Sequence, residues 1–322
     1  MAERKKRLTN LWTKVVDGEQ GEWFSRVVIE ATKPFDGTAR HEPGGILFEA
    51  RDIFLNMPEE TIPVNDGLVR EIRVSRSERP GGGEDVRVEI LPALSGAVPF
   101  RLKRVESFPF RVELLLDRFL LVNLLKGKKI VVDPGHGGAD PGGKGPVSLL
   151  EKNTVVPIAR NLEKILTRAG AQVLLTRTGD ETLSLKDRFA MTGRFGADLF
   201  VSVHMHASAD EKEEGAAVRC APGGGPAEEL ARHIGDELVR KLHVRNRGVL
   251  PGEALALLAG IPAVEVEVVT ITNIVEEVFL RSLTIQKRAA EAVFNGIVRY
   301  FAAQEGMLSP AAGGTSGGRE GD

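Results

Sequence analysis

Residues 128–138 read Lys-Lys-Ile-Val-Val-Asp-Pro-Gly-His-Gly-Gly, an apolar run that ends in a glycine-rich turn. The run predicts a buried strand, and the turn places His136 at its end with the ring free to bind something. Helix and strand patterns alternate after this point, which predicts an open, mostly parallel α/β sheet flanked by helices. The expected elements are a helix at 153–169, a strand at 172–176, a helix from 184, strands at 198–203 and 215–220, helices at 226–243 and 284–302, and strands near 255–258 and at 262–268.

Two nucleotide-binding motifs share the strand and glycine-rich turn, but neither fits this chain. A dinucleotide fingerprint needs a third glycine or alanine as the helix opens and an acidic residue at the end of the second strand. Here residues 140–143, Asp-Pro-Gly-Gly, continue the loop, and the second strand ends in Thr176-Arg177. A P-loop needs Ser or Thr after its lysine, whereas Gly145 follows Lys144.

Two further groups are expected at the same edge of the sheet as His136. The apolar strand at 198–203 ends in His204, and Glu151 opens the helix that follows the glycine-rich turn. Helix starts and carboxyl ends of strands face one edge of an open α/β sheet, so His136, Glu151 and His204 can converge. Two imidazoles and one carboxylate suit zinc, and a catalytic zinc site keeps three protein ligands and one water.

The last predicted strand carries two acids in an otherwise apolar run. Glu265 and Glu267 lie two positions apart, so on a strand they share one face. A buried carboxylate without a partner is costly, and a role beside a metal explains such residues at lower cost.

Six segments in series resemble those of the zinc-dependent N-acetylmuramoyl-L-alanine amidases. They are residues 130–138, 151–153, 174–177, 184–188, 197–204 and 262–267. Their order and spacing agree over roughly residues 127 to 302, and several motifs in series are far more specific than any single one. The resemblance implies that His136, Glu151 and His204 bind Zn²⁺ and that Glu267 is catalytic. It also implies an enzyme that hydrolyses the amide bond between N-acetylmuramic acid and L-alanine in peptidoglycan, with a catalytically silent peptidoglycan-binding protein as the alternative.

The chain departs from the family pattern at three places. The family usually reads Glu-x-Gly-Phe where this chain has Glu267 followed by Val-Val-Thr. Glu265 stands where an aliphatic residue is usual. His206 stands where a small amide or polar residue is usual, and we interpret it as a neighbour of the ligands.

Residues 20–118 predict a separate, smaller all-β sandwich. Short apolar or alternating runs recur at 24–31, 46–54, 69–74, 86–91 and 108–115, separated by Gly- and Pro-containing turns. The order and position of this region resemble the amidase N-terminal (AMIN) domain, which would target the enzyme to the wall. The expected division is an arm at 1–19, the β domain at 20–118, the catalytic domain at 126–304 and a disordered tail at 305–322.

Composition bounds the remaining classes. The chain has 322 residues, 42% of them hydrophobic, and no stretch approaches the roughly 18 apolar residues of a membrane span. The formal net charge of −2 argues against a nucleic-acid binder. The family resemblance implies peptidoglycan as the partner, and we expect a monomer. A wall hydrolase is expected in the cell envelope or outside the cell. Residues 1–12 lack the apolar segment of a signal peptide, so the sequence also leaves a cytoplasmic location open.

Overall fold

The computed structural model describes residues 5–79 and 83–309, and these form two compact units. One unit is mostly β and takes in the described parts of residues 5–64, 68–117 and 302–309. The other is α/β and comprises residues 65–67 and 118–301. Along the described chain, no helix is both long and apolar enough to cross a bilayer.

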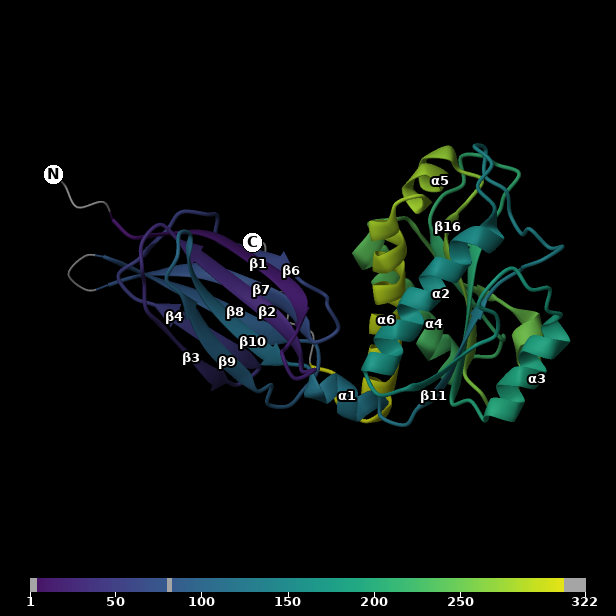
Figure 1. Cartoon of the computed structure of the whole chain (residues 1–322), viewed down its shortest axis with the longest axis horizontal. Helices are drawn as coiled ribbons and strands as arrows, with labels where there is room; N and C mark the ends of the chain where they lie inside the picture. The colour runs from purple at the N-terminus through teal and green to yellow at the C-terminus, as the bar shows by residue number, and fades with distance from the viewer. Residues whose placement is uncertain (1–4, 80–82, 310–322) are drawn as a thin grey trace, which may run out of the picture. The chain divides into compact units, whose positions relative to one another are not determined.

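The all-β unit is built from two five-stranded sheets (Figure 1). The strands are β1 (Arg7–Asp17), β2 (Trp23–Ala31), β3 (Gly37–Glu42), β4 (Gly45–Ala50), β5 (Phe54–Leu55), β6 (Glu60–Pro63), β7 (Val69–Glu78), β8 (Glu84–Pro92), β9 (Phe100–Val105) and β10 (Phe110–Asp117). The sheet orders are β5-β1-β2-β10-β9 and β3-β4-β8-β7-β6, and all pairs are antiparallel except β1 with β5. Alternate residues of β8 are buried, which is the period-2 pattern of a strand with one face on a core. The expected all-β region is confirmed.

The ends of the chain differ in part from the expected arm and tail. Residues 7–17 are not an arm, because β1 pairs along its length with β2. The buried residues Leu8 and Leu11 are three positions apart, because the pairing shifts register between Leu8 and Asn10, so the sequence lacks the period-2 pattern of a strand. At the other end, the backbone of residues 307–309 forms hydrogen bonds with the β unit: Met307 O accepts the Ser95 N–H, and Ser309 donates its N–H to Ala93 O. The rest of the expected tail, residues 310–322, lies outside the described residues.

The α/β unit contains one six-stranded sheet of order β12-β11-β13-β16-β14-β15. Its strands are β11 (Lys129–Pro134), β12 (Gln172–Leu175), β13 (Leu199–His206), β14 (Ala216–Cys220), β15 (Asn246–Pro251) and β16 (Ala263–Thr270). All neighbouring pairs are parallel except β14 with β16. The open, mostly parallel sheet predicted from the sequence is therefore confirmed.

Helices cover both faces of this sheet. They are α1 (Phe119–Leu125), α2 (Glu151–Arg168), α3 (Leu185–Phe195), α4 (Pro226–Leu242), α5 (Ile274–Leu280) and α6 (Leu283–Gln304). Figure 1 shows α2 and α6 on one side of the sheet and α3 on the other. Ser184 caps α3 by accepting a hydrogen bond from the Asp187 backbone N–H, and the Ser-x-x-Asp pattern of residues 184–187 is typical of such a cap. The strand expected near 255–258 is instead a short 3₁₀ helix, Glu253–Leu257, because a short apolar run does not by itself distinguish the two.

Candidate metal centre

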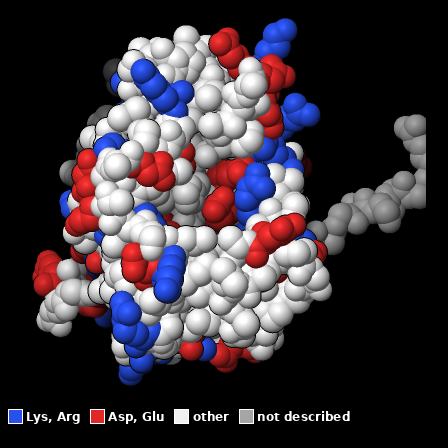
Figure 2. All heavy atoms as spheres, turned by 90° about the vertical axis from the view of Figure 1, so that its right-hand side faces the viewer, with Lys and Arg blue, Asp and Glu red and all other residues white. Residues whose placement is uncertain are grey.

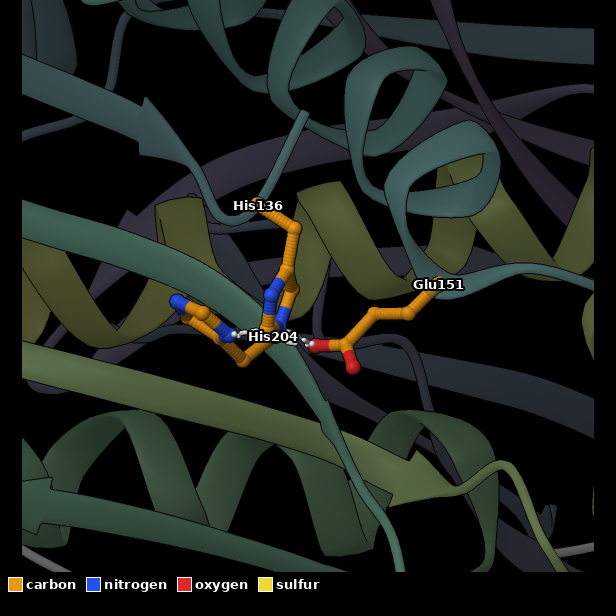
Figure 3. A group of neighbouring side chains, drawn as sticks. All are labelled: His136, Glu151 and His204. Carbon is orange, nitrogen blue, oxygen red and sulfur yellow. Dashed lines mark hydrogen bonds and ion pairs between the residues drawn. The ribbon is translucent and has the colours of Figure 1, made fainter. Parts of the chain in front are cut away.

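The structure brings together the three side chains predicted as metal ligands (Figure 3). His136 Nε2 and His204 Nδ1 each lie 3.0 Å from Oε1 of Glu151, and the two ring nitrogens are 3.1 Å apart. One donor atom from each residue falls within 4.8 Å of the others, the only such group of three among the residues that the structure describes. Three donors this close can share one cation.

The glycine-rich turn is shaped by the close approach of two strands. β11 and β13 pair in parallel, and Gly135 donates its N–H to Val203 O at 3.0 Å. A Cβ on Gly135 would lie 2.1 Å from the His204 ring, so only glycine lets the ring sit there. His136 itself has a φ of 59°, a left-handed conformation that turns its side chain toward His204.

Glu151 is fixed by backbone donors as well as by the two rings. It is the first residue of α2 and is 2% exposed. Its Oε2 accepts the Gly143 N–H at 2.7 Å, and its Oε1 accepts the Met205 N–H at 2.8 Å. A carboxylate in the first turn of a helix is also favoured by the helix dipole. The oxygen that faces the histidines is therefore held in place before any ion binds.

The pKa directions of the three groups indicate that the buried carboxylate of Glu151 stabilises positive charge beside it. Burial disfavours the charged form of Glu151, but hydrogen bonds and charge from His136 and His204 outweigh it and hold its pKa far below the usual range. Burial lowers the pKa of His136, yet Glu151 and Asp140 together raise it to about 9. The pKa of His204 is raised by Glu151 and Glu265 against the same effect of burial.

A divalent cation would supply the positive charge that this carboxylate stabilises. Two imidazole nitrogens and one carboxylate oxygen are the donor set of a three-ligand zinc site, and the buried oxygen of Glu151 faces both rings equally. The residues present thus fit zinc.

Two buried arginines hold the turn that carries His136. Arg188 donates to Asp133 Oδ1 at 2.5 Å and to the carbonyl oxygen of His136 at 2.6 Å. Arg177 donates to the carbonyl oxygens of Pro134 at 2.9 Å and Gly135 at 2.5 Å. Fixed guanidinium groups on successive carbonyls restrict the backbone of the turn, and so orient the ring of His136.

The two acids of β16 lie next to the three-residue group, in different surroundings. In the parallel register Glu267 is opposite His204, but its carboxylate accepts hydrogen bonds from Arg219 Nε and Arg247 Nη1, both at 2.6 Å. Glu267 is 4% exposed, whereas one third of the Glu265 side chain is exposed. Oε2 of Glu265 lies 4.0 Å from His204 Nε2.

The residues around Glu267 include two that the sequence reading missed. Arg219 and Arg247 come from β14 and β15, which were not expected to contribute to the site. The charged Arg219 in the otherwise apolar run Ala-Ala-Val-Arg-Cys was the available signal. His206 contacts Glu267 through Nδ1 at 3.5 Å and Glu213 through Nε2 at 3.2 Å, so it lies beside the acid and outside the three-residue group.

Comparisons with known proteins agree with this geometry. Residues 130–299 match the family model described as N-acetylmuramoyl-L-alanine amidase. The chain is 34% identical over 188 residues to a probable cell wall amidase, LytH, of Staphylococcus epidermidis, covering 58% of this chain and 62% of that protein. It is 30% identical over 225 residues to the N-acetylmuramoyl-L-alanine amidase AmiA of Escherichia coli, covering 54% of this chain and 77% of AmiA.

Solved structures resemble the same part of the chain. The amidase AmiC2 of Nostoc punctiforme matches with a TM-score of 0.51 and 30% identity, over 54% of this chain and 98% of AmiC2. The CwlD amidase of Clostridioides difficile, solved in complex with the GerS lipoprotein, matches with a TM-score of 0.53 and 30% identity, over 55% of this chain and all of CwlD. These matches concern the α/β unit, and the AMIN-like character of the β unit stays a prediction. The family match spans more than half of the chain and includes all three converging residues, and the chain therefore belongs to the N-acetylmuramoyl-L-alanine amidase family.

Proposed function

We propose that this chain is a zinc-dependent hydrolase that cleaves the amide bond between N-acetylmuramic acid and L-alanine in peptidoglycan. The observation that carries the proposal is the convergence of His136, Glu151 and His204 inside the region that matches the amidase family. The chain spans 62% of the length of its staphylococcal relatives. We further propose that it acts as a monomer at the cell envelope.

His136 Nε2, His204 Nδ1 and Glu151 Oε1 would hold the zinc ion, because these atoms already face one another. When bound by three protein ligands, zinc polarises a carbonyl group and lowers the pKa of water towards about 7. The chain's own part is to orient the ligands: Arg177 and Arg188 hold the turn of His136, and backbone N–H groups hold Glu151.

Glu267 is our proposed general base and acid. Its carboxylate would take a proton from the attacking water and deliver it to the nitrogen of the leaving L-alanine. Its support is its place opposite His204 in the β13–β16 register and its fixed position between Arg219 and Arg247. Figure 2 supports a polar substrate, because the face that it shows is hollowed and has acidic side chains in the hollow with basic ones beside them.

One observation favours the alternative, a catalytically silent peptidoglycan-binding protein. Each oxygen of Glu267 already accepts a hydrogen bond from an arginine, so only its remaining lone pairs are available to take a proton from water. We therefore treat turnover, in addition to binding, as the property that has to be measured.

The test combines metal content with turnover. Purified protein should contain about one zinc per chain, and incubation with purified peptidoglycan should release new L-alanine amino termini. A chelator should abolish release, and added zinc should restore it. Protein that holds zinc and binds peptidoglycan but releases no amino termini would establish the silent alternative, and protein without zinc would refute the metal site.

We also propose the expected division of labour. The α/β unit would be catalytic, and the β unit, which includes β1, would target the wall. Tethering a wall-binding unit to a catalytic unit raises the local concentration of substrate. Removing the β unit should thus lower activity on intact wall far more than on soluble wall fragments.

A further inference from the structure

The outward nitrogen of His136 has a carboxylate partner. Nε2 of this ring faces Glu151, and Nδ1 lies 2.8 Å from Oδ2 of Asp140. The other oxygen of Asp140 accepts the Gly142 N–H at 3.0 Å, so the carboxylate is itself anchored. A histidine that binds a metal through one nitrogen commonly donates its other N–H to a carboxylate, which fixes the tautomer and the ring orientation.

Whereas His136 faces Glu151 with Nε2, the ring of His204 faces Glu151 with its other nitrogen, Nδ1. Its Nδ1 faces Glu151 and His136, and its Nε2 points toward Glu265, whose Oε2 is 4.0 Å away. The sheet register explains this placement. Glu265 is paired with Ser202 on the neighbouring strand, and His204 is two residues further along the same face.

The chemistry of His204 requires a particular tautomer. For Nδ1 to offer its lone pair to a cation, the ring proton must sit on Nε2, and that proton needs an acceptor. Glu265 is the acidic group facing Nε2 at this distance, and a small side-chain torsion or one bridging water would complete the hydrogen bond.

We propose that Glu265 is the positioning residue of His204, holding the proton on Nε2 so that Nδ1 faces the metal, as Asp140 does for His136. The inference rests on the proposed metal site. It assigns Glu265 a role separate from that of Glu267, whose carboxylate is directed to Arg219 and Arg247.

Two other roles for Glu265 predict different behaviour. If it bound a cationic group of the substrate, its loss would raise KM and leave zinc affinity unchanged. If it only paired with Arg219, whose Nε is 3.8 Å from Oε1, its loss would leave both zinc affinity and the His204 ring unchanged.

The experiment uses the full chain with Glu265→Leu and Glu265→Gln. Glu229→Leu is the matched control, because Glu229 is also one-third exposed and lies 3.9 Å from a histidine, His233, on α4. Zinc affinity is measured by competition with a chromophoric chelator, and the His204 Nε2–H resonance is followed by NMR.

We expect Glu265→Leu to weaken zinc binding by about 10- to 100-fold. Glu265→Gln should lose less, because its amide oxygen still accepts a hydrogen bond, and Glu229→Leu should match the wild type. The His204 Nε2–H resonance should move only in the Glu265 variants. If Glu265→Leu does not fold, Glu265→Gln alone decides.

Wild-type zinc affinity and an unmoved His204 resonance in the Glu265 variants would overturn the inference while leaving the proposed function intact. A wild-type protein that takes up no zinc would overturn both. The NMR arm, which also reads the tautomer of the metal-free ring, separates the two failures.

Discussion

Arg219 Nε lies 2.6 Å from Oε1 of Glu267, so the carboxylate proposed as the base is bound to a guanidinium from the neighbouring antiparallel strand. Arg247 Nη1 holds the other oxygen at the same distance. Among the described residues, this is the acid of β16 with the more fixed position, while Glu265 is partly open to solvent. The relationship allows a direct test of which acid does the chemistry.

Glu267→Gln should retain zinc and lose hydrolysis by about 10²- to 10⁴-fold, because the amide keeps the shape but cannot accept the proton. Glu265→Gln, assayed with saturating zinc, should lose far less. Turnover on purified peptidoglycan and zinc content, measured on the same preparations, check the prediction. If the two variants behaved in the opposite way, the chemistry would have to be assigned to Glu265.

The metal centre predicts a selective loss of zinc on substitution of His136. His136→Asn is preferable to alanine, because asparagine tolerates the left-handed φ of 59° at this position. The variant should bind zinc so weakly that gel filtration removes it, and activity should vanish with the metal. His233→Asn on α4 is the control, since the His233 side chain is 17% exposed against 21% for His136. Full zinc content in His136→Asn would contradict the ligand assignment.

The sequence was sufficient to predict the three converging residues, for a physical reason. His136, Glu151 and His204 stand at strand ends or a helix start, and in an open parallel sheet all such positions face one edge. The local pattern of each element therefore predicted their neighbourhood without knowledge of packing.

The sequence could not predict the arginines around Glu267. Arg219 reaches it because β14 runs antiparallel beside β16, and Arg247 follows from the pairing of β15 with β14. That strand order is set by long-range packing, which no local pattern records. Arg177 shows the same limit. The guanidinium of this buried side chain donates hydrogen bonds to backbone carbonyl oxygens, among them that of Pro134, and no local pattern records such partners.

The buried ion pair between Arg188 and Asp133, next to the turn of His136, can be tested by substitution. The side chains of Arg188 and Asp133 are 6% and 3% exposed, and they are ion-paired at 2.5 Å. Arg188→Met should cost about 3–5 kcal/mol of unfolding free energy, because it leaves a buried carboxylate without its cation. Urea denaturation of the metal-free protein measures the loss. Arg194→Met, an exposed position on the same helix, should stay within about 0.5 kcal/mol of the wild type. Equal urea midpoints for the two variants would contradict a stabilising role of the Arg188–Asp133 ion pair.

The last prediction concerns Glu277, which ties the loop before Glu151 to α5. Its side chain is fully buried and accepts the Val147 N–H at 2.6 Å, the Leu149 N–H at 2.9 Å and Arg281 Nη2 at 2.8 Å. Burial raises the pKa of this carboxyl, but the two backbone donors and Arg281 outweigh it and hold the pKa below its ordinary value of 4.5.

A depressed folded-state pKa fixes the sign of the pH dependence. The stabilisation is present above the unfolded pKa of 4.5 and is lost as pH falls through the lower folded value. Glu277→Gln removes the ionised acceptor, so the wild type should exceed it in unfolding free energy by about 1–3 kcal/mol near pH 7, and this excess should shrink as pH falls below 4.5. Urea titrations between about pH 3 and 7 measure the difference, with the exposed Glu253→Gln as a control that should match the wild type throughout. An excess that did not change with pH would show that the ionised carboxylate of Glu277 does not hold the loop.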